Sequence, residues 1–120
     1  MTETLISGKL PILALRGLAV FPDQTVHFDV GRPKSIRALE AAMKQAQNIF
    51  LVPQKNILED DPSEDGLYPV GIVAKVKQVL KTHGENLRVL VTGMCRAQIA
   101  ELEQKEPYLS GMIRAVPELE

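Results

Sequence analysis

Side chains that could carry catalysis are few in this sequence, and none lies in a recognisable catalytic motif. The chain has a single cysteine, Cys95, and two histidines, His27 and His83. A nucleophile needs a base beside it and a site for the developing negative charge, and no spacing here indicates such an arrangement. We interpret Cys95 as a small core residue, His27 as part of a polar strand face and His83 as part of a turn. The sequence therefore predicts no catalytic residue.

The acidic stretch DPSEDG contains the best candidate metal ligands. Asp61, Ser63 and Asp65, with Gly66 behind them, match the first half of a calcium-binding loop. The twelfth position of such a loop requires a bidentate acid, and here it is Ile72. We therefore expect a solvated acidic loop and no metal. Glycines stand singly between the apolar segments, so no phosphate-binding loop and no cofactor are expected in this chain.

The composition is typical of one globular domain, and its charge gives no strong electrostatic attraction to polyanions. The 120 residues are 45% hydrophobic and 24% charged, with a net charge of −1 and an isoelectric point near 6.1. This balance disfavours nucleic acid and acidic membranes as partners. A lone cysteine cannot form an internal disulfide, which indicates a reducing, cytoplasmic compartment. No basic leader and no apolar run near the ~20 residues of a membrane span is present.

The elements that must position these side chains are mostly strands. Residues 10–15 are apolar on both faces, which is typical of a central strand covered on both sides. Residues 25–30 alternate and should be half buried. Further strands are expected at residues 49–53, 68–80, 87–94, 98–103 and 109–116, with the turn THGEN closing a long hairpin. On the strand 68–80 we expect one buried face, formed by Val70, Ile72, Ala74, Val76 and Leu80.

One helix is predicted over residues 33–47. Pro33 suits the first turn of a helix, and Glu40 and Lys44 are spaced as an exposed pair. We expect the helix to pack on a sheet through one apolar stripe, formed by Ile36, Leu39, Ala42, Met43 and Ala46. Six or seven strands with one helix favour a mainly β (α+β) fold, as a small mixed sheet or a partly closed barrel of about six strands.

Four stretches together resemble the amino-terminal domain of the Lon protease family, which are ATP-dependent serine proteases of the AAA+ class. They are LPILALRGLAVFP, VGRPKSIRALEAAM, IFLVPQK and VGIVAKVKQVLKTHGENLRVLVTGMCRAQI, in the order of the family across residues 10–113. One departure is Thr92, where the family usually has glutamate. The resemblance implies a PUA-like pseudo-barrel over residues 10–116, with a flexible tail at 1–9 and the start of a helical subdomain at 117–120.

The resemblance also implies a function. The ATPase motifs of the family, its ATP and Mg²⁺, and its catalytic serine and lysine belong to domains without a counterpart in this sequence. We therefore expect a module that binds unfolded or damaged polypeptide and is not itself an enzyme. The alternatives are a domain that mainly positions a homohexamer, or a stand-alone protein with a Lon-like domain. RNA binding through Lys75, Lys77 and Lys81 is the least favoured reading, because acids balance them and aromatic residues are scarce.

The connection after the first strand is unusually apolar for a turn. Arg16-Gly17 should turn the chain, yet Leu18, Val20, Phe21 and Pro22 follow, where polar residues are usual. Two interpretations remain open. Val20 and Phe21 could fold back and close one end of the barrel, or some of the four could stay exposed as a patch that contacts substrate. The candidate substrate-binding residues are therefore Leu18, Val20, Phe21 and Pro22.

Overall fold

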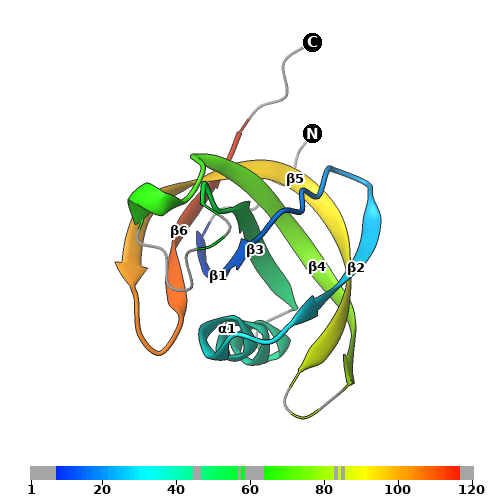
Figure 1. Cartoon of the computed structure of the whole chain (residues 1–120). Helices are drawn as coiled ribbons and strands as arrows, with labels where there is room; N and C mark the ends of the chain where they lie inside the picture. Colours follow the sequence, from blue (N-terminus) through cyan, green and yellow to red (C-terminus); the bar gives the residue numbers. More distant parts are fainter. Residues whose placement is uncertain are drawn as a thin grey trace.

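The computed structural model describes residues 8–44, 47–56, 58, 64–82, 84 and 86–116. Six strands and one α-helix are present in this part of the chain (Figure 1). In chain order they are β1 (Gly8–Leu15), β2 (Thr25–Val30), α1 (Pro33–Met43), β3 (Asn48–Pro53), β4 (Val70–Lys81), β5 (Leu87–Gln104) and β6 (Leu109–Ala115), with a short 3-10 turn at Glu64–Gly66. The prediction of a mainly β fold with one helix is confirmed. β1 starts at Gly8, so Gly8 and Lys9 belong to the sheet, although the sequence placed them in the tail.

The strands form one sheet that closes on itself. Their order is β2-β5-β4-β3-β1-β6, and β6 pairs with β5 as well. β1 and β3 are parallel, and the other pairs are antiparallel. Closure removes the open edges of five strands. Among the described strands, β2 is the one that pairs on a single side.

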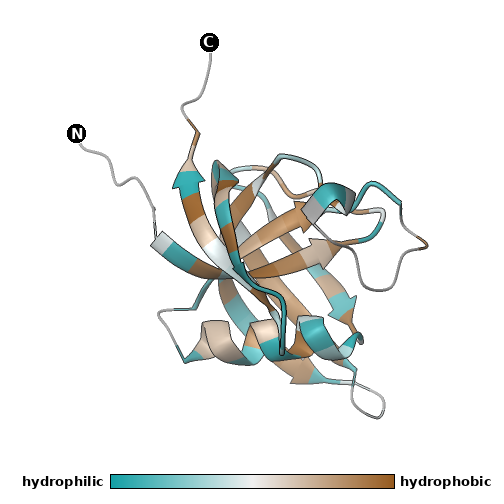
Figure 2. Ribbon diagram, turned by 90° about the vertical axis from the view of Figure 1, so that its left-hand side faces the viewer, coloured by the Kyte–Doolittle hydropathy of each residue, from teal (hydrophilic) through white to brown (hydrophobic). Residues whose placement is uncertain are grey.

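Two cores lie on opposite faces of the central strands. Successive residues of β1 and β3 alternate between them, because neighbouring side chains on a strand point to opposite faces. The first core holds Leu13, Leu15, Ile49 and Leu51, and the second holds Ile12, Ala14, Phe50 and Val52. The sequence prediction that the first strand is central and covered on both sides is confirmed. Figure 2 shows the hydrophobic residues gathered on these inner strands and the hydrophilic ones on the loops.

The helix α1 covers the first core. Its buried face is formed by Ser35, Ala38, Leu39 and Ala42, and small residues there let the helix approach the sheet closely. Burial of Leu39 is confirmed, but burial of Met43 is wrong, because 41% of that residue is exposed. Ile36 and Met43 are seven residues apart and point in one direction, toward the margin of the buried face. The helix also ends at Met43 instead of residue 47.

β5 is one strand of 18 residues, where the sequence predicted two. Its first part pairs with β2 and β4, and its last part pairs with β6. Register shifts interrupt the pairing, and at the first of them Cys95 and Gly93 are matched to neighbouring residues of β4 while Met94 is extra. A bulge of this kind bends the strand and changes the phase of its alternation. The sequence pattern therefore looked broken where the strand is continuous.

A second register shift explains an error on β4. Leu80 was expected on the buried face, but half of it is exposed, and Val79 packs against the first core instead. The shift lies between Val76 and Gln78. One extra residue moves every later side chain to the opposite face, so the period-2 pattern fails beyond it. Val70, at the other end of the predicted face, is 40% exposed.

Candidate functional site

The apolar connection between β1 and β2 ends in a tight turn. Gln24 donates its backbone N–H to the carbonyl of Phe21 at 3.1 Å, which closes a four-residue β-turn. Pro22 and Asp23 occupy its centre, and Asp23 has φ of 65°. Proline followed by a positive φ is the pattern of a type II turn. The Gln24 side chain accepts a further hydrogen bond from the Phe21 N–H at 3.0 Å.

This turn is fixed to β5 at Gly93. The N–H of Asp23 donates to the carbonyl of Gly93, and the N–H of Gly93 donates to the carbonyl of Gln24, both at 2.9 Å. A Cβ on residue 93 would lie 2.3 Å from the carbonyl oxygen of Phe21, so glycine is required for this approach. The connection is therefore held by backbone contacts, and its side chains need not be buried to hold it in place.

The four candidate residues have different environments. Val20 is 5% exposed and belongs to the first core, and Leu18 packs against the same core while half buried. Pro22 is half buried. Phe21 is 53% exposed. Each of the two interpretations from the sequence is thus correct for one residue. Val20 folds back into the core, and Phe21 stays exposed. Contact of these residues with substrate stays a prediction.

Phe21 stands at an apolar hollow, which we call the Phe21 cleft. It is surrounded by Pro53, Val70 and Ile72 and by aliphatic side chains of β1 and β3. Arg96 is the charged residue that lines it. Its volume is about 120 Å³. That is well below the roughly 300–1,000 Å³ of small-molecule sites, so the cleft has the size for a side chain rather than a cofactor.

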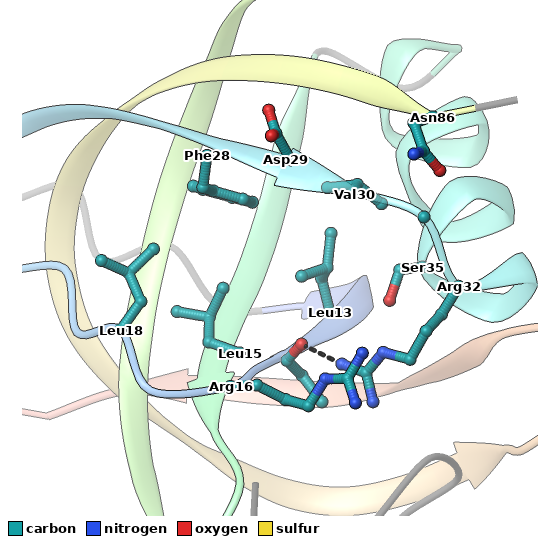
Figure 3. Close-up of a pocket in the computed structure, with 12 residues that line it drawn as sticks. Leu13, Leu15, Arg16, Leu18, Phe28, Asp29, Val30, Arg32, Ser35 and Asn86 are labelled. Carbon is teal, nitrogen blue, oxygen red and sulfur yellow. Dashed lines mark hydrogen bonds between the residues drawn. The ribbon is translucent and has the colours of Figure 1, made fainter. Parts of the chain in front are cut away.

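A larger hollow lies on the other side of the same connection, between β1 and β2, and we call it the β2 groove. Its volume is about 510 Å³. Figure 3 shows β2 passing over a floor of leucines, with the guanidinium groups of Arg16 and Arg32 on the side of these leucines away from β2. The residues that line it are Leu13, Ala14, Leu15, Arg16, Leu18, Phe28, Asp29, Val30, Gly31, Arg32, Ser35 and Asn86.

Arg32 is held in a fixed position at this groove. It donates hydrogen bonds to the carbonyl of Ala14 at 2.7 Å and to Oε1 of Gln54 at 2.6 Å. Gln54 is 3% exposed, and its own N–H donates to the carbonyl of Leu15 at 2.8 Å. Neither Arg32 nor Gln54 was predicted from the sequence as a functional residue. Gln54 follows an apolar strand and precedes an acidic loop, and nothing in that pattern indicates burial.

On the outer face of β2, Asp29 pairs with Arg88 of β5. Nε of Arg88 lies 2.9 Å from Oδ1 of Asp29, and both side chains are largely exposed. The hydrogen bond from Arg88 is the main cause that holds the pKa of Asp29 below its usual range, and the charges of Arg88 and His27 act in the same direction. Thr25 and Thr92 are matched in the same way, with their Oγ1 atoms 3.0 Å apart. Thr92 thus has a threonine partner across the two strands.

The other chemical candidates remain apart from these hollows. His27 is exposed on β2, and Cys95 is half buried against the second core, as a small core residue would be. Asp65 is exposed, while Asp61, Ser63 and His83 lie outside the described residues. Within the described part of the chain, no group of three or more His, Cys, Asp or Glu could hold a metal ion. None of the described helices is long and apolar enough to cross a membrane.

Solved structures with the same fold are known. The N-terminal domain of Mycobacterium avium complex Lon protease matches 93% of this chain and 56% of its own, with a TM-score of 0.74 and 25% sequence identity. The Lon N-terminal domain protein from Xanthomonas campestris matches 91% of this chain and 60% of its own, with a TM-score of 0.66. Its identity of 12% means that it supports the fold alone.

Sequence comparison agrees with the fold. The Lon protease of Desulforamulus reducens is 50% identical over 83% of this chain, and Lon protease 1 of Bacillus subtilis is 45% identical over 94% of it. The chain spans 12% and 15% of the length of these two relatives. A family model of the ATP-dependent protease La (LON) substrate-binding domain matches residues 9–120. The chain therefore belongs to the family of Lon substrate-binding domains.

Proposed function

We propose that this domain recognises unfolded or damaged polypeptide for an ATP-dependent serine protease of the AAA+ class. In this proposal ATP, Mg²⁺ and the proteolytic residues act in other domains, the assembled protease is a homohexamer, and the setting is the cytoplasm. The relatives named Lon protease and the family of substrate-binding domains support the role.

The observation that carries the proposal is the half-exposed Phe21 beside an apolar cleft. An aromatic side chain in water costs free energy, and the sequence could have placed a polar residue in this turn. The backbone of the turn is already fixed by Gly93, so Phe21 would lose little conformational freedom on binding. A rigid aromatic beside a hollow of side-chain size suits weak contacts with many apolar side chains.

The same surface is less suited to a large permanent interface. Phe21 and Val70 are the large apolar side chains of the cleft that are exposed, and the small Ala19 lies beside them. An obligate interface typically buries more than about 2,000 Å² in total and is rich in apolar groups. A small patch of this kind favours transient capture over assembly as the task of this surface.

An NMR titration tests the proposal. The ¹⁵N-labelled chain is titrated with reduced, carboxamidomethylated α-lactalbumin, which stays unfolded and carries no added charge. We expect shifts that centre on Phe21, Val70 and Arg96. Phe21→Ser should weaken binding by about tenfold, the effect of losing roughly 1.4 kcal/mol of apolar contact, and leave the melting transition nearly unchanged.

Met43→Ser is the matched control, because Met43 is a similarly exposed apolar residue on α1. It should bind as the unmodified chain does. A large loss of stability in Phe21→Ser would assign Phe21 to the core and contradict the proposal. Shifts that depend on the concentration of the chain, with no unfolded protein present, would favour the assembly role instead.

A further inference from the structure

We propose that the open edge of β2 binds an extended segment of unfolded polypeptide as an added β-strand, with an acidic side chain of that segment at Arg16 and Arg32. The inference rests on the proposed function and specifies how a substrate is held. It concerns the β2 groove, whose lining shares Leu15 alone with that of the Phe21 cleft.

The hydrogen-bonding pattern of β2 shows which backbone groups face outward. Gly93 donates its N–H to the carbonyl of Gln24, so these two residues form a hydrogen-bonded pair at the start of the ladder. Hydrogen-bonded and non-hydrogen-bonded pairs alternate along antiparallel strands. By this alternation Thr25, His27 and Asp29 direct their N–H and C=O groups away from β5.

The side chains agree with this assignment. Cross-strand side chains approach most closely in non-hydrogen-bonded pairs. Thr25 with Thr92 and Asp29 with Arg88 are such pairs in the register, and both are in contact, at 3.0 and 2.9 Å. The outward backbone groups of three alternate residues can accept one added strand.

The open edge is also poorly protected against pairing. Proteins usually block an exposed strand edge with lysine, proline or a bulge inside the strand. β2 reads TVHFDV, which contains neither lysine nor proline. Its acidic residue, Asp29, is paired with Arg88 of β5, and its register with β5 is continuous over residues 25–30. An edge of this kind is suited to strand addition, a common way of binding extended peptides.

The β2 groove offers room for the side chains of an added strand. Phe28 and Val30 of β2 form one wall, and Leu13, Leu15 and Leu18 form the apolar floor (Figure 3). Every second side chain of a bound strand would point to this floor, and the others would point to solvent. The volume of about 510 Å³ is enough for several side chains of an extended segment.

Positive charge in the groove narrows the choice of occupant further. Arg16 and Arg32 both line the groove, on the side away from β2, and hydrogen bonds to Ala14 and Gln54 orient Arg32 before any ligand arrives. Asp29 is the acidic residue of the lining, and it is engaged by Arg88. The groove therefore complements a segment with alternating apolar residues and a carboxylate that points into the groove with them, toward Arg16 and Arg32.

Backbone-methylated peptides test strand addition. The probe is an acetylated, amidated heptapeptide that begins with glutamate and continues with alternating threonine and leucine, so that the glutamate and the leucines share the face toward the groove. Two derivatives carry N-methyl groups on alternate amides, one on the leucines and one on the threonines. Only one set of amides can face β2, so one derivative should bind at least about tenfold more weakly and the other should bind nearly as well as the probe. Equal affinities of the two derivatives would overturn strand addition.

Variants of the protein locate the site. His27→Pro removes one outward N–H without removing a bond to β5, and it should weaken the probe at least about tenfold with the fold retained by circular dichroism. Arg16→Gln should lower the affinity for the glutamate probe and leave unchanged the affinity for a version with glutamine in place of that glutamate. Equal loss for both versions would contradict the role of charge. If His27→Pro does not fold, the methylated peptides still decide the question.

The outcomes separate this inference from the proposed function. Binding of unfolded α-lactalbumin at the Phe21 cleft, with both methylated peptides bound alike, would overturn strand addition and leave the proposed function intact. Absence of binding by both the unfolded protein and the heptapeptide would overturn both. Shifts at Thr25, His27 and Asp29 that appear with the probe and vanish with one derivative would support the inference.

Discussion

Gly93 lies directly against the carbonyl group of Phe21, with no space for a side chain between them. A Cβ at residue 93 would stand 2.3 Å from the carbonyl oxygen and 3.0 Å from the carbonyl carbon of Phe21. The hydrogen bonds of Asp23 and Gln24 with Gly93 surround this contact. The position of the exposed aromatic ring thus depends on a residue without a side chain, Gly93, on β5.

Gly93→Ala should therefore displace the turn from β5. The obstacle is backbone and cannot rotate away, so we expect a loss of about 1–3 kcal/mol in the free energy of unfolding, as for other overpacked sites. Urea denaturation measures the loss, and the NMR shifts of residues 20–24 report the displacement. Gly84→Asn is the control, because nothing lies within 4 Å of that site and asparagine tolerates its positive φ. A cost for Gly93→Ala no greater than for the control would contradict this account.

Leu39 and Met43 should differ sharply in what they contribute to stability. Leu39 is 1% exposed and part of the first core, so Leu39→Ala should cost about 2–5 kcal/mol. Met43 is 41% exposed, and Met43→Ala should cost less than about 1 kcal/mol. Chemical denaturation of the two variants side by side checks the difference. Similar costs would mean that the helix packs with another face.

The Asp29–Arg88 pair should contribute to the pH dependence of the free energy of unfolding. Because its folded pKa is lowered, Asp29 contributes stability above its unfolded pKa and loses that contribution as pH falls through the folded value. In Arg88→Gln the pKa of Asp29 should rise, which ¹³C NMR titration of the carboxyl carbon measures. The stability difference between the two proteins should shrink as pH falls below about 4. An unchanged pKa of Asp29 in the variant would show that the pair does not persist in solution.

The purified chain should hydrolyse neither ATP nor peptides. We expect this because no phosphate-binding loop and no recognisable catalytic motif can be found in the sequence. Phosphate release and cleavage of a fluorogenic peptide are the two assays. Fractions from a size-exclusion column provide the control, because a contaminant separates from the chain. Activity that follows the chain through every fraction would refute this prediction.

Local patterns in the sequence determined most of the fold. The strand Gly8–Leu15 and the strand Asn48–Pro53 are apolar at every position of their centres, and this alone requires cover on both faces. The alternation over Thr25–Val30 and the stripe that contains Leu39 identified a half-buried strand and a helix. Periodicity is a property of neighbouring residues, so it can be read without knowing the partners of a segment.

Part of the candidate site could also be read from the sequence. The apolar turn, with Phe21 in it, stands out in the sequence because turns are usually polar. The sequence could not decide between Val20 and Phe21, which are adjacent and both apolar. Their difference in exposure, 5% against 53%, arises from contacts of the turn with Gly93, which lies far away along the chain.

Tertiary structure alone decided the features that depend on pairing between distant strands. The bulge on β4 reversed the exposure of Leu80. β5 continues through its own bulge as one strand, where the sequence predicted two. The β2 groove exists because the closed ring of strands does not include β2. Arg32 is held at the groove by hydrogen bonds to Ala14 and Gln54. Such features follow from register and from contacts across the sheet. A local pattern carries no information on which distant residue completes it, and for that reason they could not be predicted from the sequence.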